Sequence, residues 1–125
     1  MRKLSEIDEL LKDSDLVNKW IEIRNKEKVL INVTDVNLKY KVHKTKYQLK
    51  LPEEYTEVTG AIIVTPDFNE EGKYVLLRGW RIFKFAQLAG QEKINAYITH
   101  TGRVKFAMKL QKIKEDMEKE KENTI

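Results

Sequence analysis

The sequence has 125 residues, no cysteine and two prolines, with 41% hydrophobic residues, 35% charged residues and a formal net charge of +4 at pH 7. A chain of this length and hydrophobic content can bury its own core, which excludes a disordered protein. The lack of cysteine excludes a disulfide framework, a thiol nucleophile and the common zinc sites. No apolar run is long enough to cross a membrane and the N-terminal stretch is too charged for a secretory signal, so we expect a cytoplasmic protein without membrane contact.

Charge is segregated into blocks along the chain. Residues 37–52 contain five lysines and no acid, residues 53–72 contain six acids and no base, and residues 73–114 contain ten basic residues against one acid, Glu92. A fold that brings the two basic blocks together would create a positive face for an anionic partner. The alternative is that these lysines only solvate the outer sides of strands and helices.

Two short helices are expected near the N-terminus. Ser5 with Asp8 three residues later is typical of a helix start, and Ser14 is placed to cap a second helix that runs to about Lys26. Apolar residues at helical spacing should give each helix a buried side: Ile7, Leu10 and Leu11 in the first, and Val17, Trp20 and Ile21 in the second.

Strand patterns follow. Residues 29–33 form a short apolar run, and the strict alternation from Asn37 to Leu51 predicts either two strands or one bent strand, with Leu38 on the inner face and lysines on the outer face. Residues 61–65 and 73–77 are two further apolar strands, separated by a polar turn. They predict a β-hairpin.

A helix is expected directly after this hairpin, with Gly90 in position to end it. Phe83 and Phe85 point to nearly opposite sides of a helix, so either the helix is buried on two sides or one aromatic residue marks a partner surface. The second alternative predicts a homodimer through the aromatic helix 80–89.

The remaining elements complete an α+β prediction. A strand at residues 94–99 precedes a C-terminal helix from about residue 103, whose apolar side contains Phe106, Leu110 and Ile113. We therefore expect a small mixed β-sheet with N-terminal helices, a central helix after a β-hairpin and a C-terminal charged helix, forming one domain over residues 1–114. Residues 115–125 are expected to be a charged, frayed tail.

The order strand, turn, strand, Gly79-x-Arg81, helix, Leu-Ala-Gly and Ile94-x-Ala-x-Ile98 resembles the ParB-like (ParB/sulfiredoxin) N-terminal domain over residues 61–98. The resemblance implies a ParB-like core over about residues 29–99. It also implies an accessory or regulatory protein of a plasmid, a phage or another mobile element.

The sequence departs from this family at positions that bear on chemistry. Trp80 stands where the family has Glu, Ile82 replaces its second Arg, and Asn95 occupies the usual Pro site. The family motif binds nucleotide phosphate, so the resemblance implies either a nucleotide-binding (CTP-like) switch or enzyme that uses Gly79 and Arg81, or a binding protein that has lost catalysis. The redox chemistry of the sulfiredoxin branch is excluded because it needs a cysteine.

Three groups of residues are candidates for anion binding. Positive charges beside a helix N-terminus form an anion or nucleotide site, here Arg78, Gly79, Arg81 and Lys84. Lysines along one sheet face suit the phosphates of a nucleic acid, namely Lys39, Lys41, His43, Lys46 and Lys50. The C-terminal helix adds a further basic group, namely Arg103, Lys105, Lys109 and Lys112. For each group the alternative is a solvated surface.

Other chemistries find no support in the sequence. His43 and His100 are far apart with no cysteine or paired histidine, so we expect no metal and no cofactor. No nucleophile–base set and no phosphate-binding loop is present, so we expect no catalytic residue. The preferred hypothesis is a non-catalytic protein that binds DNA, or alternatively RNA, through phosphates. A nucleotide switch and a protein-interaction module are the alternatives.

Overall fold

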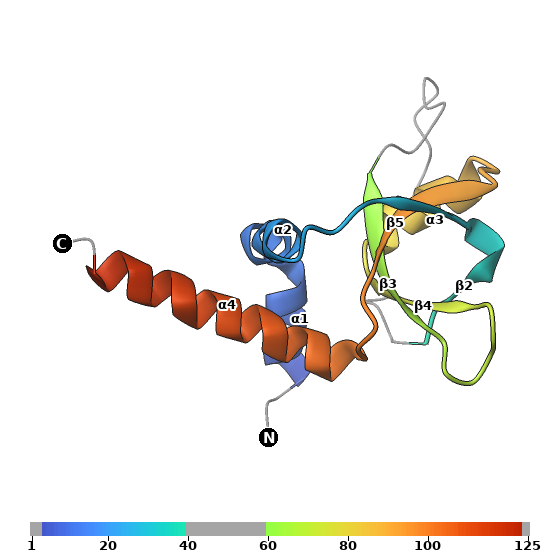
Figure 1. Ribbon diagram of the computed structural model, residues 1–125. Helices are drawn as coiled ribbons and strands as arrows, with labels where there is room; N and C mark the ends of the chain where they lie inside the picture. Colours follow the sequence, from blue (N-terminus) through green and yellow to red (C-terminus); the bar gives the residue numbers. More distant parts are fainter. Residues whose placement is uncertain (1–3, 40–59, 124–125) are drawn as a thin grey trace. The chain divides into compact units, whose positions relative to one another are not determined.

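The computed structural model describes residues 4–39 and 60–123 (Figure 1). The chain divides into two compact units, one built from Met1–Glu27 with Thr101–Ile125 and the other from Lys28–His100. The first, here called the helical unit, contains α1 (Leu4–Lys12), α2 (Ser14–Ile23) and α4 (Arg103–Asn123). The second, the sheet unit, contains all five described strands, the helix α3 (Trp80–Leu88) and a 3-10 turn (Val33–Asp35).

The sheet unit is a mixed sheet with the strand order β1-β5-β3-β4-β2. Its strands are β1 (Val29–Asn32), β2 (Val36–Asn37), β3 (Ala61–Pro66), β4 (Tyr74–Arg78) and β5 (Lys93–Ile98). The hairpin partners β3 and β4 are antiparallel, whereas β3 and β5 are parallel and β1 is antiparallel to β5. The α+β class and the hairpin followed by a central helix are therefore confirmed.

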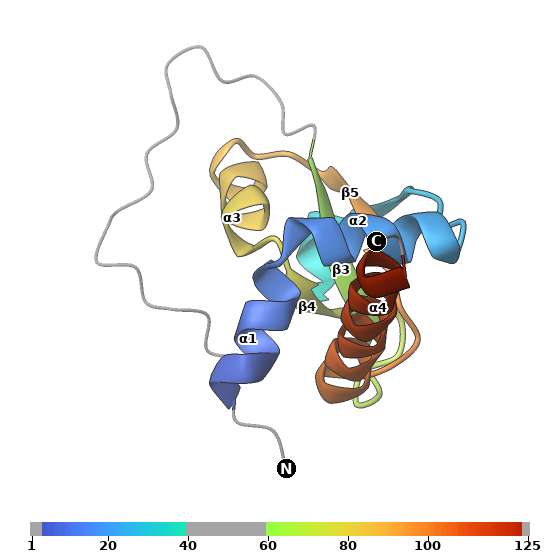
Figure 2. The same ribbon diagram turned by 90° about the vertical axis from the view of Figure 1, so that its left-hand side faces the viewer.

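The core of the sheet unit lies between the sheet and α3, which Figure 2 shows beside the strands. Ile62 and Val64 alternate toward this core on β3, where they meet the buried ring of Phe83. Trp80 and Phe85 are half-buried and pack against the same core, so the aromatic residues of α3 contact one cluster from several sides. Every aromatic side chain of α3 is thus at least partly buried within the sheet unit.

Two glycines set the limits of α3. Gly79 adopts φ +98°, and a Cβ there would lie 2.9 Å from Cγ2 of Ile62. Only glycine permits this left-handed backbone at so close an approach to the neighbouring strand. At the other end, Gly90 has φ +69°, and the Gln91 N–H donates to the Ala86 carbonyl at 3.0 Å, which forms the glycine stop that the sequence predicted.

In the helical unit, both α1 and α2 contact α4. Trp20 of α2 meets Phe106 of α4 edge-on, with ring centroids 4.8 Å apart. Phe106 and Leu110 are fully buried, which confirms the predicted apolar side of the C-terminal helix. Aromatic edge-to-face contacts add to the hydrophobic burial that holds these helices together.

Four local features differ from the sequence prediction. The cap of α2 is Asp13 instead of Ser14, because the Asp13 carboxylate accepts from the Asp15 and Leu16 N–H groups. Strand β2 ends at Asn37, and Leu38 is exposed instead of facing the core. The first strand gives way to the 3-10 turn at Val33. Helix α4 continues to Asn123, through the segment expected to fray.

Candidate nucleic-acid interface

Basic side chains from two separate parts of the sequence come together in the helical unit. Lys105, Lys109 and Lys112 lie at positions i, i+4 and i+7 of α4 and therefore share one side of that helix. Arg24 and Lys26 follow the end of α2, and the charges of both act on Lys109. These five residues are called the basic surface below.

Lys109 lies where this positive charge is concentrated. Burial lowers the pKa of its ammonium group, and the neighbouring charges of Arg24 and Lys26 lower this pKa further. Among the residues that the structure describes, neither Arg24 nor Lys109 forms an ion pair with an acid. Like charges that act on one another in this way repel, and a bound anion would relieve that repulsion.

The end of α2 holds Arg24 and Lys26 in place. Asn25 adopts a left-handed backbone with φ +48°, and the Lys26 N–H donates to the Ile21 carbonyl at 3.0 Å. Asn is among the few residues other than Gly that tolerate this conformation at a helix end. The Lys26 ammonium then lies 5.5 Å from the centroid of the Trp20 ring, a cation–π distance. The sequence pattern did not predict a role for this pair, although an Asn between two basic residues just after a helix is a visible stop signal.

Arg103, the remaining predicted basic residue of α4, lies apart from the basic surface. It is seven residues before the buried Leu110, and so on the same side of the helix as that residue. Arg103 is half-buried, and burial lowers the pKa of its guanidinium. The half-buried position of Arg103 indicates that its side chain packs near the start of α4.

The predicted anion site lies at the start of α3 in the sheet unit. Gly79 is the N-cap and supplies no side-chain hydrogen bond to the first turn of the helix. Arg81 is exposed within that turn, Lys84 is half-buried one turn later, and Arg78 is half-buried at the end of β4. The structure therefore places all four predicted residues on or next to the first two turns of one helix, at an end where the helix dipole favours anions.

Lys39 has a different environment from the one its strand pattern predicted. Its Nζ donates to Oδ1 of Asp67 at 2.7 Å, and the Asn37 side chain donates to Oδ2 at 2.9 Å. The Asn69 N–H also donates to Oδ1, at 2.9 Å. The hydrogen bond from Lys39 is the main cause that lowers the pKa of Asp67 to about 2, and those from Asn37 and Asn69 contribute further.

Asp67 is thus a buried carboxylate whose partner charge is Lys39. A second ion pair joins Lys73 Nζ to Asp35 at 3.0 Å, and the Lys73 hydrogen bond is the main cause that lowers the pKa of Asp35. The other four predicted residues of the lysine face, Lys41, His43, Lys46 and Lys50, lie outside the described residues. Lys39 itself serves to neutralise Asp67, a role that the sequence pattern could not show.

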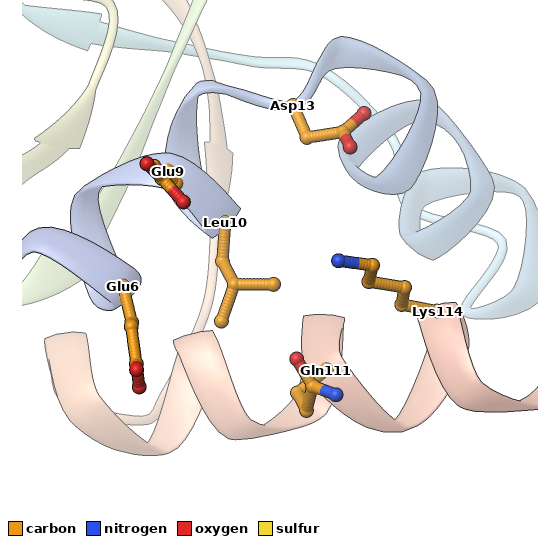
Figure 3. Close-up of a pocket in the computed structure, with 6 residues that line it drawn as sticks. All are labelled: Glu6, Glu9, Leu10, Asp13, Gln111 and Lys114. Carbon is orange, nitrogen blue, oxygen red and sulfur yellow. The ribbon is translucent and has the colours of Figure 1, made fainter. Parts of the chain in front are cut away.

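A pocket of about 410 Å³ lies within the helical unit and is drawn in Figure 3. Residues of α1 and α4 and the cap of α2 line it: Glu6, Glu9, Leu10, Asp13, Gln111 and Lys114. Three carboxylates and a single ammonium give it the opposite charge to the basic surface. The pocket is therefore not part of a site for nucleic-acid phosphates.

Metal-binding clusters and membrane-spanning helices are both absent from the described part of the chain. No group of His, Cys, Asp or Glu side chains there is large enough to hold a metal ion. No helix within residues 4–39 and 60–123 has both the length and the apolar composition needed to cross a membrane.

No protein-family model matches the sequence, and no curated protein matches it. Among solved structures, the chain is similar to the C-terminally truncated chromosome-partitioning protein ParB from Caulobacter crescentus complexed with CTP-gamma-S, with a TM-score of 0.45 and 16% sequence identity. The similarity covers 66% of this chain and 51% of that one, so this chain spans about half the length of its structural neighbour. It concerns the fold alone and carries no inference about ligand or partner.

Proposed function

We propose that this protein binds nucleic acid without catalysis and that the basic surface of the helical unit contacts the phosphate backbone. The observation that carries this proposal is the gathering of Arg24 and Lys26 near Lys109, whose pKa is lowered by burial and further by the charges of these two residues. A group of basic residues whose titration is perturbed by burial and by neighbouring like charges is a candidate binding site, and an anion would relieve the repulsion between them. Lys105 and Lys112 extend the positive charge along α4 in a row that suits successive phosphates.

The contacts of such a surface would be mainly electrostatic. Lysine ammonium groups bind phosphates as point charges, and none of the five residues of the basic surface is an aromatic residue that could stack with bases. Trp20 is fully buried and serves to position Lys26. The proposal is therefore a phosphate-reading protein with modest sequence preference, for which duplex DNA is the first ligand to test.

The test is a fluorescence-anisotropy titration of the full chain against random duplex and single-stranded DNA at two salt concentrations. Wild-type protein should bind, and affinity should fall steeply as salt rises, because each bound phosphate releases counterions. Replacing Lys105 and Lys109 together by Glu should reduce the slope of log K against log salt by about 0.9 for each phosphate that is no longer bound.

The control is Lys93→Glu, which changes the net charge in the same direction, by half as much, at an exposed position of the sheet unit. This variant should retain most of the affinity. Equal losses of binding free energy per unit of charge in the control and in the double variant would mean that only net charge matters, and absence of binding at low salt would overturn the proposal.

A second function, anion or nucleotide binding at the start of α3, is favoured by one specific observation. The first turn of α3 follows Gly79, which supplies no capping side chain, and the exposed Arg81 lies in that turn. A phosphate there would meet backbone N–H groups and a guanidinium together. A thermal shift of the wild-type protein with cytidine triphosphate that disappears in Arg81→Ala would support this function.

A further inference from the structure

The turn between β3 and β4 presents an aromatic ring to solvent. Phe68 is 79% exposed, the highest value among the large hydrophobic side chains that the structure describes. Glu70 and Glu71 follow it in the same turn, and both are exposed. An aromatic side chain with acids beside it is a poor match for DNA or for an anionic membrane, because phosphates would be repelled.

Hydrogen bonds hold this turn in a single shape. The buried Asp67 carboxylate accepts from the Asn69 N–H at 2.9 Å, and backbone bonds join Asp67 to Lys73 and to Glu70. Lys39 fixes the same carboxylate from outside the turn at 2.7 Å. A ring presented by a preorganised turn loses little conformational freedom when it binds, which makes it an effective anchor.

A complementary surface exists on α4. Val104 and Met108 are 55% and 57% exposed, and they lie one helical turn apart. Lys105 and Lys112 are three residues before and four residues after Met108, so both flank it on the helix surface. We call Val104, Lys105, Met108 and Lys112 the apolar–basic face of α4.

We propose that this protein self-associates, with the Phe68 turn of one molecule docked on the apolar–basic face of α4 of a second copy. The Phe68 ring packs between Val104 and Met108, whose flexible thioether adapts to aromatic rings. Glu70 and Glu71 meet Lys105 and Lys112, so charge and apolar surface match at the same contact. Because these two lysines also belong to the basic surface, nucleic acid and a second copy compete for them. The proposed contact joins two molecules, so association should depend on protein concentration.

The experiment is sedimentation velocity of the full chain without nucleic acid, over a range of protein concentrations and at about 0.05 M and about 0.5 M salt. The wild-type protein should show a concentration-dependent increase in mass that weakens with salt. Phe68→Ala should weaken association by about tenfold or more, since a buried aromatic anchor contributes more than its neighbours. The exposed position of Phe68 means that this variant should fold normally, which circular dichroism checks.

A charge exchange identifies the two surfaces. Glu71→Lys alone and Lys105→Glu alone should each associate poorly, whereas their equimolar mixture should recover association, because each turn then faces an opposite charge. Leu88→Ala is the control, since Leu88 is an exposed apolar residue of α3 outside both surfaces.

Three results would overturn the proposal. The protein could remain a monomer at every concentration in low salt, or Phe68→Ala could associate like the wild type. Association that Leu88→Ala removes, but Phe68→Ala does not, would assign the contact to α3 instead.

Discussion

The Lys39 ammonium and the Asp67 carboxylate form an ion pair of 2.7 Å in which the acid is almost wholly buried and the lysine partly exposed. This pair joins the residues after β2 to the turn after β3, across 28 positions of sequence. Lys39 belongs to the basic block of residues 37–52 and Asp67 to the acidic block of residues 53–72. In the sheet unit these two side chains neutralise one another.

Low pH should lower the stability of the fold, because it protonates the Asp67 carboxylate. The pKa of folded Asp67 is about 2, below the ordinary value of 3.8, so the ionised group stabilises the fold above pH 3.8. That contribution is lost as the pH falls from 3.8 through about 2. Lys39→Met removes the main cause of the lowered pKa and should move the acid transition, followed by circular dichroism, to higher pH. Lys39→Arg keeps the charge and should behave like the wild type, and identical transitions in all three proteins would contradict this account.

Gly79→Ala should destabilise the protein by more than Gly72→Ala. Both glycines have positive φ, so each alanine costs about 1–2 kcal/mol from the left-handed backbone. At Gly79 the new Cβ also meets Ile62 at 2.9 Å, whereas at Gly72 nothing lies within 4 Å. Urea unfolding of the two variants measures the difference, and equal losses of stability would mean that Ile62 moves aside at no cost.

Phe83→Ala and Phe68→Ala each remove a phenyl ring, the first from the buried core and the second from an exposed turn. Phe83 is fully buried in the core of the sheet unit, so its removal should cost about 3–5 kcal/mol of unfolding free energy. Phe68 is exposed in the turn, so its replacement should change stability by less than about 0.5 kcal/mol. Chemical denaturation measures both. A large fall in stability at Phe68 would show that its ring supports the fold.

Arg81→Ala should reduce the binding of phosphate-containing ligands at α3 with little change in stability, because the Arg81 side chain is exposed. Isothermal titration with cytidine triphosphate and a melting curve of the same sample separate the two effects. A marked fall in melting temperature would instead assign Arg81 a structural role.

Local sequence patterns predicted the elements whose boundaries depend on nearby residues. The hairpin from β3 to β4, the start of α3 at Gly79 and its end at Gly90 all follow from short-range alternation and from glycine conformations. The sequence could not show that Asp13, and not Ser14, caps α2, because both side chains are common helix caps. In the structure the Asp13 carboxylate accepts the hydrogen bonds of the first turn.

Features that depend on distant partners were not predictable in this way. The parallel pairing of β3 with β5 joins residues that are separated by β4 and α3. The alternating pattern placed Lys39 on a lysine face, yet it pairs with Asp67. The basic surface likewise needs Arg24 and Lys26 to meet Lys109, from the two ends of the sequence. The sequence shows the net charge of each block, but it does not show which residues lie next to one another in the folded chain.

The helical unit is discontinuous in sequence, with the whole sheet unit inserted between α2 and α4. During synthesis α1 and α2 leave the ribosome before the sheet unit, and their apolar sides must wait for α4, which is made after the sheet unit. Trp20 cannot meet Phe106 until the whole sheet unit and the start of α4 have emerged. The sheet unit, by contrast, is continuous in sequence and can fold while α4 is still being translated, so it can be complete before the helical unit forms.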